Sequence, residues 1–186
     1  DKKADSRPDV FGYQPAGPGF HTRGTIKIQD GCDNFCSYCI IPLVRGPGTS
    51  RPLPDVLEHA RQLVAAGCRE IILTGVNINQ YRWIPAAESG QPSRAVNLTG
   101  LINYLLNMNL PKDHDFRLRI GSLEPDLLDA EFVALFKHPR LCHSLHICLQ
   151  SGDDTMLEAM NRRYRVADFR WLVRQLRTLD PLFTIT

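Results

Sequence analysis

The sequence lacks long hydrophobic runs, a strong excess of one charge and a dense set of cysteines. No apolar stretch approaches the roughly 20 residues that a membrane-spanning helix needs, and we expect no secretory signal. The formal net charge of +2 is too small to indicate nucleic-acid binding by itself. Six cysteines among 186 residues are too few for a disulfide-stapled scaffold. The composition therefore predicts a soluble, cytoplasmic, globular chain with one core and no membrane segment.

A second pair of closely spaced cysteines is also missing, which limits what the cysteines that do stand together can bind. Cys32, Cys36 and Cys39 follow an apolar run over residues 25–29, which predicts a strand with the cysteines on the loop at its carboxyl end. Such short spacings are expected to bring three thiolates to one point, as a metal centre requires. A structural zinc site takes four protein ligands, usually with a second close pair. The remaining cysteines are scattered and are predicted to be small core residues: Cys68, Cys142 and Cys148.

Three thiolates are also one fewer than an iron–sulfur cluster normally takes. A cubane of four irons held by three cysteines keeps one iron open, much as a catalytic zinc keeps one position open for substrate. The triplet therefore predicts a centre for chemistry rather than a structural staple. The alternatives are an ordinary zinc or redox site and three buried cysteines.

The rest of the chain alternates between strand-like and helix-like patterns, which predicts an α/β fold with parallel strands and right-handed crossovers. Strands are predicted over residues 25–29, 70–74, 116–120, 144–149 and 182–186. Helices are predicted to begin at Pro54, at Asn97 or Thr99 and at Asp126, with a short helix through 156–160 and a last one through 169–176. Residues 1–21, charged and then rich in Pro and Gly, are predicted to be a linker or a cut domain boundary, and 82–97 a loop.

Small and polar residues follow several of the predicted strands. Residues 74–77, 122–124 and 150–152 each stand where a strand ends. Ligands of parallel sheets collect at the carboxyl ends of the strands, so we expect these residues around the cysteine loop. Glu124 is either a polar group of this site or the start of a helix. Phe35 is expected to shield the centre from water.

The spacing Cys32-x3-Cys36-x2-Cys39, with Tyr38 before the last cysteine, resembles the signature of the radical S-adenosylmethionine (SAM) enzymes. The resemblance implies a [4Fe–4S] cluster on these cysteines whose open iron binds the amino and carboxylate groups of S-adenosylmethionine. It also implies that electron transfer cleaves the cofactor to methionine and a 5′-deoxyadenosyl radical. The residues that it implies as cofactor-binding are Tyr38, Thr74, Gly75, Asn77, Gln150 and Ser151. Their plainer alternatives are packing for Tyr38, a turn for Gly75 and helix capping for Gln150 and Ser151.

Within this superfamily the chain resembles the methylthiotransferase branch. Cys39–Pro42, Arg119–Pro125 and Met160–Tyr164 look most like the enzymes that act on threonylcarbamoyladenosine beside a tRNA anticodon. Carbon 2 of adenine has no acidic proton for a side chain to remove, so a radical suits such chemistry. The alternatives are the sister enzymes for isopentenyladenosine and for a ribosomal protein, and a non-catalytic iron–sulfur or zinc-binding module.

The resemblance covers residues 22–186 and predicts a partial TIM-type (β/α) barrel that stops in its fifth strand. Full-length members carry an amino-terminal domain with a second [4Fe–4S] cluster, which delivers sulfur, and a small β-rich domain that grips RNA. We therefore expect an incomplete radical SAM core, marginal or self-associating alone and not competent for full turnover. The implied partners of the parent protein are tRNA and an electron donor such as a flavodoxin or ferredoxin.

Several cationic and aromatic side chains have two possible roles each. Arginines on the loops are candidates for the cofactor carboxylate or RNA phosphates, since guanidinium forks suit both: Arg45, Arg51, Arg162, Arg163 and Arg165. The Arg162–Arg163 pair is the candidate fork for the carboxylate of threonylcarbamoyladenosine. Trp83 is predicted on a loop, where it could stack on a base, and Trp171 is predicted to pack.

Overall fold

The structure, a computed structural model, describes residues 10–12, 22–86, 94–110 and 115–186. The predicted linker over residues 1–21 lies almost wholly outside the described residues, as does the middle of the predicted loop over 82–97. The strands, which form one four-stranded and two two-stranded sheets, are β1 (Arg23–Asp30), β2 (Thr49–Ser50), β3 (Glu70–Gly75), β4 (Arg82–Trp83), β5 (Val96–Asn97), β6 (Arg117–Ile120), β7 (Ser144–Leu145) and β8 (Thr184–Ile185).

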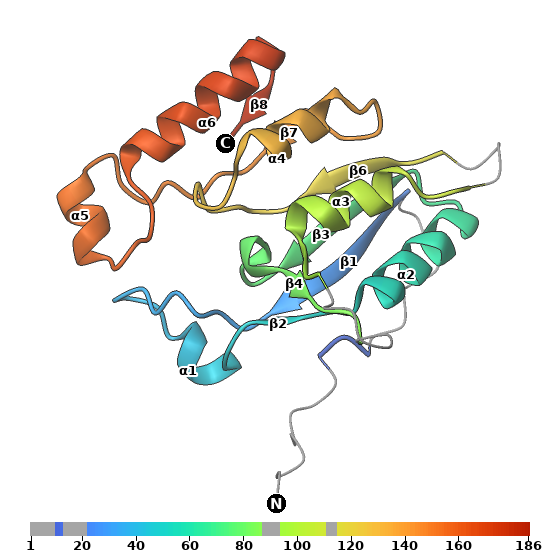
Figure 1. Cartoon of the computed structure of the whole chain (residues 1–186), viewed down its shortest axis with the longest axis horizontal. Coiled ribbons are helices and arrows are strands. Elements are labelled where there is room, and N and C mark those ends of the chain that lie inside the picture. Colours follow the sequence, from blue (N-terminus) through green and yellow to red (C-terminus); the bar gives the residue numbers. More distant parts are fainter. Residues whose placement is uncertain (1–9, 13–21, 87–93, 111–114) are drawn as a thin grey trace, which may run out of the picture.

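The central sheet has the order β2-β1-β3-β6, in which β1, β3 and β6 run parallel. Ile26 pairs with Leu73, and Leu73 pairs with Ile120, so one buried row crosses all three strands. A second parallel pair, β7-β8, continues the curl, and single parallel bridges such as Leu123 to Ile147 connect it to the first sheet. The strands therefore form a curled half-barrel, which confirms the predicted partial (β/α) barrel (Figure 1).

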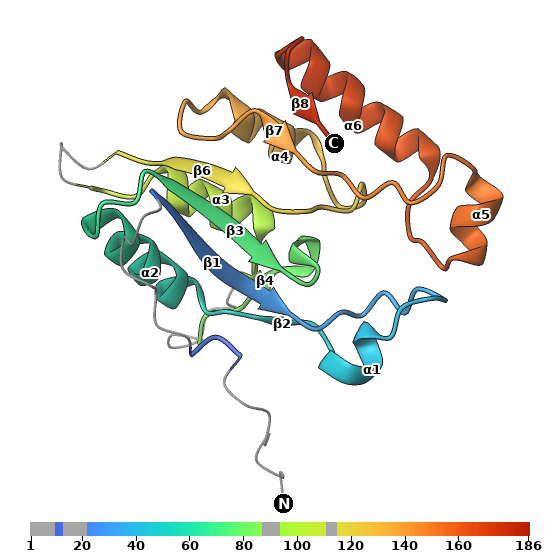
Figure 2. The same ribbon diagram turned by 180° about the vertical axis from the view of Figure 1, so that it is seen from behind.

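The longer helices cover one face of this curled sheet, as comparison of Figure 1 with Figure 2 shows. The longer ones present an apolar stripe at helical spacing, and burying each large side chain of that stripe contributes roughly 1.5–3 kcal/mol. The helices of at least five residues are α1 (Ile41–Arg45), α2 (Leu53–Ala65), α3 (Leu98–Leu106), α4 (Ala130–Ala134), α5 (Asp154–Ala159) and α6 (Val166–Leu179). Two short 3₁₀ turns join them, η1 (Ile78–Gln80) and η2 (Leu135–Lys137). No helix in the described ranges is long and apolar enough to cross a membrane.

The predicted start of the helix after residue 97 is correct. Asn97 caps α3, with its side-chain oxygen accepting a hydrogen bond from the Gly100 N–H at 2.9 Å. The predicted start at Asp126 is wrong, because α4 begins at Ala130 and Asp129 is its cap. Leu127 between them has a φ of 60°, a left-handed conformation that a continuous helix cannot contain.

Three other predicted segments differ in extent. The strand over 144–149 shortens to β7, because the N–H groups of Ile147 and Cys148 donate to different neighbours, the carbonyls of Thr186 and Leu123. The predicted loop over 82–97 begins and ends in an antiparallel pair, β4 and β5. Antiparallel β2, for which the sequence predicted no strand, forms an edge of the central sheet.

The two tryptophans occupy places other than those predicted. Trp83 lies in β4, half-buried against the core, and not on a loop. Trp171 is 38% exposed on α6, so it is less buried than a packing residue would be.

A histidine–aspartate pair joins the start of β7 to the end of α6. The Nδ1 atom of His143 lies 2.7 Å from Oδ2 of Asp180, and its Nε2 lies 2.7 Å from the carbonyl oxygen of Phe136. The hydrogen bond to Asp180 raises the pKa of His143 above its ordinary value of 6.5, and the same bond lowers the pKa of Asp180. The charged pair therefore stabilises the fold below pH 6.5, and its contribution is lost as the pH rises through the raised pKa of His143.

We predict that the Asp180→Asn variant loses this pH dependence. The asparagine oxygen still accepts the Leu182 N–H that Oδ1 of Asp180 accepts, while the charge is removed. The melting temperature of the unmodified chain should fall from pH 6 to pH 8 by more than that of the variant. Equal pH profiles for the two proteins would show that the pair does not contribute.

Candidate functional site

The cysteine loop leaves the carboxyl end of β1 through a tight glycine turn. Gly31 has a φ of 68°, and a Cβ there would lie 2.1 Å from the Pro47 carbonyl oxygen, so no other residue fits. Cys32 and Cys36 are buried and Cys39 is half-buried, and all three are free thiols. The Cys39 N–H donates to the Cys36 carbonyl at 2.9 Å, which closes the turn between the second and third cysteines.

The base of this loop is held by a buried carboxylate. Asp30 accepts hydrogen bonds on both oxygens from Nη2 of Arg45, at 2.7 and 2.8 Å, and one from Nζ of Lys27 at 2.9 Å. Burial alone would raise the pKa of Asp30, but these cationic donors outweigh it and lower the pKa. Arg45 is thus engaged within the chain, and Arg51 likewise lies 2.7 Å from Nδ1 of His59.

The segment over 160–164, which follows α5 much later in the chain, contacts the same loop (Figure 1). The Met160 carbonyl accepts the Ser37 N–H at 3.2 Å, and the Asn161 amide donates to the carbonyls of residues 34 and 35 at 3.1 and 2.9 Å. Arg163 donates to the Asp33 carbonyl at 2.6 Å. The sequence analysis named the Arg162–Arg163 pair of this segment as a candidate fork for a substrate carboxylate, but it did not foresee these contacts with the cysteine loop.

A buried ion pair lies between that segment and the end of β6. Nη1 of Arg162 donates to Oε1 of Glu124 at 2.7 Å, and their side chains are only 6% and 15% exposed. The other carboxylate oxygen accepts the Asn34 amide at 2.7 Å, and Arg162 also donates to the Tyr38 hydroxyl. Burial alone would lower the pKa of Arg162, but the Glu124 charge outweighs it and raises the pKa. Glu124 is therefore a group of the site and not the start of a helix.

Side chains of η1 fix the neighbouring loops. The Asn79 amide donates to the Glu124 and Asp126 carbonyls at 3.0 and 2.7 Å, and its oxygen accepts the Glu124 N–H at 3.0 Å. Gln80 accepts the Asp33 N–H at 3.1 Å and donates to the Asn34 side chain at 2.8 Å. These two residues, which the sequence analysis did not single out, link the ends of β3 and β6 to the cysteine loop.

The end of β3 contributes a buried amide beside the first cysteine. Nδ2 of Asn77 lies 3.7 Å from Sγ of Cys32, while its backbone N–H donates to Oε1 of Gln29 at 2.7 Å. Its own Oδ1 is buried and has no hydrogen-bond partner among the described residues. A Cβ on Gly75 would lie 2.7 Å from the Gln29 carbonyl oxygen, so the close approach of β1 and β3 requires glycine. Thr74 is half-buried beside it and pairs with Lys27 in the sheet.

The other predicted cofactor residues differ in their surroundings. Gln150 is exposed, with a φ of 65°. The Ser151 hydroxyl accepts the Asp153 N–H at 3.2 Å, so it supports the turn before α5, as the capping alternative expected. Tyr38 is 54% exposed, so it does not pack in the core.

Within the described residues, no three His, Cys, Asp or Glu side chains surround a point where one metal ion could sit. The thiols of Cys32, Cys36 and Cys39 therefore do not converge as the spacing was expected to make them. In a cubane, however, each thiolate binds a different iron, so the ligands need not meet at one ion. Three free thiols on one loop, with the Asn77 amide beside one sulfur, fit a cluster better than a zinc ion.

Cys148 lies closer to this site than its predicted core role implied. It is half-buried, and burial raises the pKa of its thiol, with Glu124 raising it further and Arg162 opposing. Burial likewise raises the pKa of Cys36, and the Arg162 charge opposes that effect. One guanidinium thus acts on thiols from two different strand ends.

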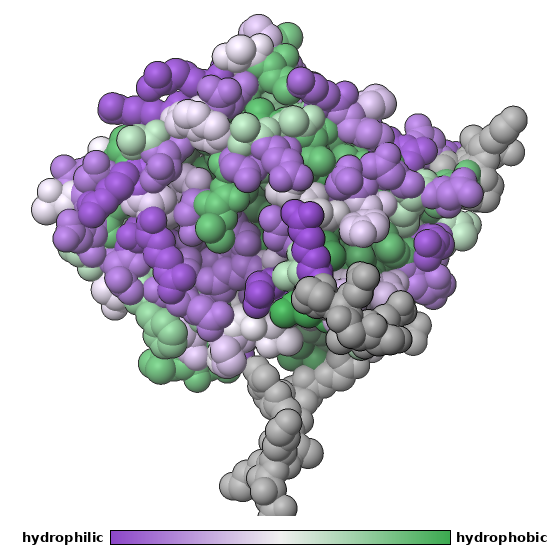
Figure 3. All heavy atoms as spheres, in the orientation of Figure 1, coloured by the Kyte–Doolittle hydropathy of each residue, from purple (hydrophilic) through white to green (hydrophobic). Residues whose placement is uncertain are grey.

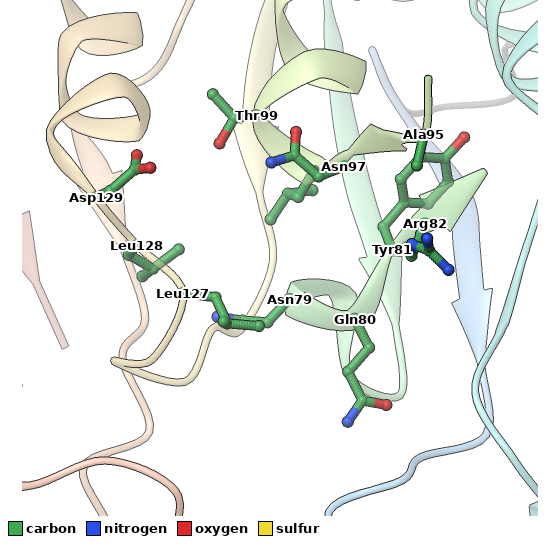
Figure 4. A pocket seen from close by; sticks show the side chains of 11 residues that line it. Asn79, Gln80, Tyr81, Arg82, Ala95, Asn97, Thr99, Leu127, Leu128 and Asp129 are labelled. Carbon is green, nitrogen blue, oxygen red and sulfur yellow. The ribbon is translucent and has the colours of Figure 1, made fainter. Parts of the chain in front are cut away.

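A pocket of about 570 Å³ adjoins the site on the far side of η1 (Figure 4). Asn79 and Gln80 form one wall, Asn97 and Thr99 at the start of α3 another, and the segment over 127–129 the third. No motif in the sequence predicted it, because its walls come from three segments that are far apart in the chain.

Comparison with known proteins gives a family and relatives. The model of the Radical SAM superfamily matches residues 26–183. The chain is 38% identical over 167 residues to a threonylcarbamoyladenosine tRNA methylthiotransferase of Thermotoga maritima, covering 89% of this chain and 36% of that protein. It is 35% identical over 162 residues to a tRNA-2-methylthio-N(6)-dimethylallyladenosine synthase of Xanthomonas campestris, covering 87% and 33%. The chain thus spans about a third of the length of these relatives.

Solved structures share the fold at low identity. A radical S-adenosylmethionine methyltransferase from Kitasatospora setae superposes with a TM-score of 0.63 at 20% identity, covering 84% of this chain and 28% of that one. A cobalamin-dependent S-adenosylmethionine radical enzyme gives 0.60 at 14%, covering 84% and 22%. These likenesses support the half-barrel architecture.

We predict that Gly75→Ala destabilises the fold by about 1–3 kcal/mol, because the added methyl group must displace backbone of β1. Gly152→Ala is the matched control, since a Cβ there meets no atom within 4 Å. It should change stability by less than about 0.5 kcal/mol. Urea unfolding of the two variants measures the difference, and equal stabilities would contradict the close approach of β1 and β3.

Proposed function

Because the chain belongs to the Radical SAM superfamily, we propose that Cys32, Cys36 and Cys39 hold a [4Fe–4S] cluster and that the adjoining strand ends bind S-adenosylmethionine. The observation that carries this proposal is the loop itself. It holds three free thiols at the carboxyl end of β1, with the Asn77 amide 3.7 Å from the Cys32 sulfur. When bound, the two cofactors supply a carbon-centred radical, which no side chain of the protein can provide.

The residues of this chain bind, orient and shield. We assign cofactor contacts to Tyr38, Thr74, Gly75, Asn77, Gln150 and Ser151. The unpartnered Oδ1 of Asn77 is an acceptor suited to the cofactor's ammonium group. Phe35 is 60% exposed beside the cysteines, which suits a side chain that excludes water once a substrate covers it.

For the parent protein we propose methylthiolation of carbon 2 of threonylcarbamoyladenosine next to the tRNA anticodon. The support is the 38% identity to the Thermotoga maritima protein of that name. The 35% identity to a dimethylallyladenosine synthase supports the alternative substrate nearly as well. A cytoplasmic location, a flavodoxin- or ferredoxin-type electron donor and a second cluster in a further domain belong to the same proposal.

The Arg162–Arg163 pair does not favour threonylcarbamoyladenosine in the way that the sequence suggested. Arg162 and Arg163 were expected to form a cationic fork for its carboxylate. Arg162 is paired with Glu124, and Arg163 donates to the Asp33 carbonyl, so both are engaged with the chain itself. The choice between the two substrates therefore depends on the relatives alone.

We predict that Cys32→Ala, Cys36→Ala and Cys39→Ala each abolish iron retention after anaerobic reconstitution. Cys68→Ala, Cys142→Ala and Cys148→Ala, the controls, should retain it. Iron content and visible absorbance measure the result, and a change of the spectrum on adding S-adenosylmethionine marks a catalytic centre. Zinc would give no visible absorbance. If Cys68→Ala lost iron as completely as Cys36→Ala, the ligand assignment would be wrong.

For the substrate, we predict a selective loss in cells that lack the full-length parent. Their tRNA should lose the methylthio group on threonylcarbamoyladenosine and keep it on isopentenyladenosine, as nucleoside mass spectrometry can show. The reverse pattern would assign isopentenyladenosine as the substrate of the parent protein and would leave the cluster assignment unchanged.

A further inference from the structure

Several hydrogen bonds join the segment Met160–Tyr164 to the cysteine loop. We propose that this segment is a clamp that fixes the loop for its cluster, and that Arg162 is a positioning residue that also raises the reduction potential of that cluster. The inference rests on the proposed [4Fe–4S] site and assigns it residues beyond the cysteines.

The clamp donates hydrogen bonds to the backbone between the first two cysteines. All three carbonyls there accept hydrogen bonds from it, Asp33 from Arg163 at 2.6 Å and residues 34 and 35 from the Asn161 amide at 3.1 and 2.9 Å. The Ser37 N–H, just beyond Cys36, donates to Met160 at 3.2 Å. The loop conformation is thus fixed from outside the loop.

The loop and the clamp each contain a residue with a strained backbone conformation, which the contacts between them can stabilise. Phe35 and Asn161 both have left-handed conformations, with φ of 50° and 57°. Such a conformation costs about 1–2 kcal/mol for a residue other than glycine, although asparagine tolerates it better. Phe35 is 60% exposed, so burial of its ring does not compensate the strain, and the hydrogen bonds from Asn161 and its neighbours do.

Among the described residues of the clamp, Arg162 is the charged side chain that is buried beside the cysteine loop. Its guanidinium lies 5.6 and 5.8 Å from the ring centres of Tyr38 and Tyr164 and donates to the Tyr38 hydroxyl, next to Cys39 in the loop. Its Nε is buried and has no hydrogen-bond partner in the described part of the chain. A buried donor without a partner is costly, so this N–H is a candidate donor to a group bound at the cysteine loop.

The charges of Arg162 and Glu124 predict the direction in which each residue shifts the reduction potential of the cluster. A nearby positive charge stabilises the reduced cluster, which carries one more electron, so Arg162 should raise the reduction potential. Glu124, on the other side of the ion pair, should lower it. Removing the Arg162 charge should therefore lower the reduction potential, and removing the Glu124 charge should raise it. A purely structural role for the pair would not produce these opposite shifts.

A first test needs no cluster. Asn161→Gly keeps the left-handed backbone but removes both side-chain hydrogen bonds to the loop. In the iron-free chain, alkylation of Cys36 and Cys39, followed by mass spectrometry, should accelerate about tenfold in the variant. Cys68 and Cys142 in the same sample are internal controls and should not change. Equal rates for Cys36 and Cys39 in both proteins would overturn the clamp.

A second test measures the potential of the reconstituted cluster. Arg162→Gln should lower it and Glu124→Gln raise it, each by a tenfold change in the equilibrium constant of reduction, about 59 mV for one electron. Arg162→Lys, which keeps the charge, should restore most of the loss, and Arg174→Gln on the exposed side of α6 is the control. Shifts of the same sign, or none, would overturn the charge assignment.

If Arg162→Gln folds by circular dichroism but retains no iron, the clamp is supported, and Glu124→Gln alone decides the sign. If the unmodified chain takes up no iron, the proposed function fails instead. That result is seen before any variant is measured, so the two failures are distinguishable.

Discussion

The ion pair between Arg162 and Glu124 is the interaction on which the geometry of the site depends. It joins the end of β6 to the segment after α5, and through Asn34 and Tyr38 it reaches the cysteine loop. Taking both charges out of water costs several kcal/mol, so such a pair adds little net stability. Removing one partner, however, leaves a buried charge and costs about 3–5 kcal/mol. The pair is therefore better understood as fixing position than as stabilising the fold.

The parallel sheet makes this contact between distant segments possible. Strands β1, β3 and β6 run in the same direction, so the loops after Asp30, Gly75 and Ile120 emerge at one edge. The curl of the sheet then brings the chain after β7 round to the same edge (Figure 2). The close packing that this demands appears at Gly75, where a single methyl group would meet the backbone of β1.

The sequence predicted the parallel strands of the half-barrel and the place of the cysteine loop, because period and strand-end polarity are local signals. It did not predict the short antiparallel strands β2, β4 and β5. It did not predict the start of α4, since the left-handed Leu127 follows from packing and not from propensity. The contacts of Asn79, Gln80 and Asn161 also escaped prediction. Their amides bind backbone that is 45 to 127 residues away, and no local pattern records such a partner. The ligand roles of the three cysteines stay predictions.

The arginines show why composition is a poor guide to recognition. Each of the five that seemed free to bind an anion donates to, or lies against, a group of the chain itself. The partners are Asp30 for Arg45, His59 for Arg51, Glu124 for Arg162, the Asp33 carbonyl for Arg163 and Glu158 for Arg165. An RNA phosphate would have to displace these partners, and for the buried pair that cost is high. Of these arginines, Arg45, Arg162 and Arg163 therefore hold the cysteine loop and the segments beside it.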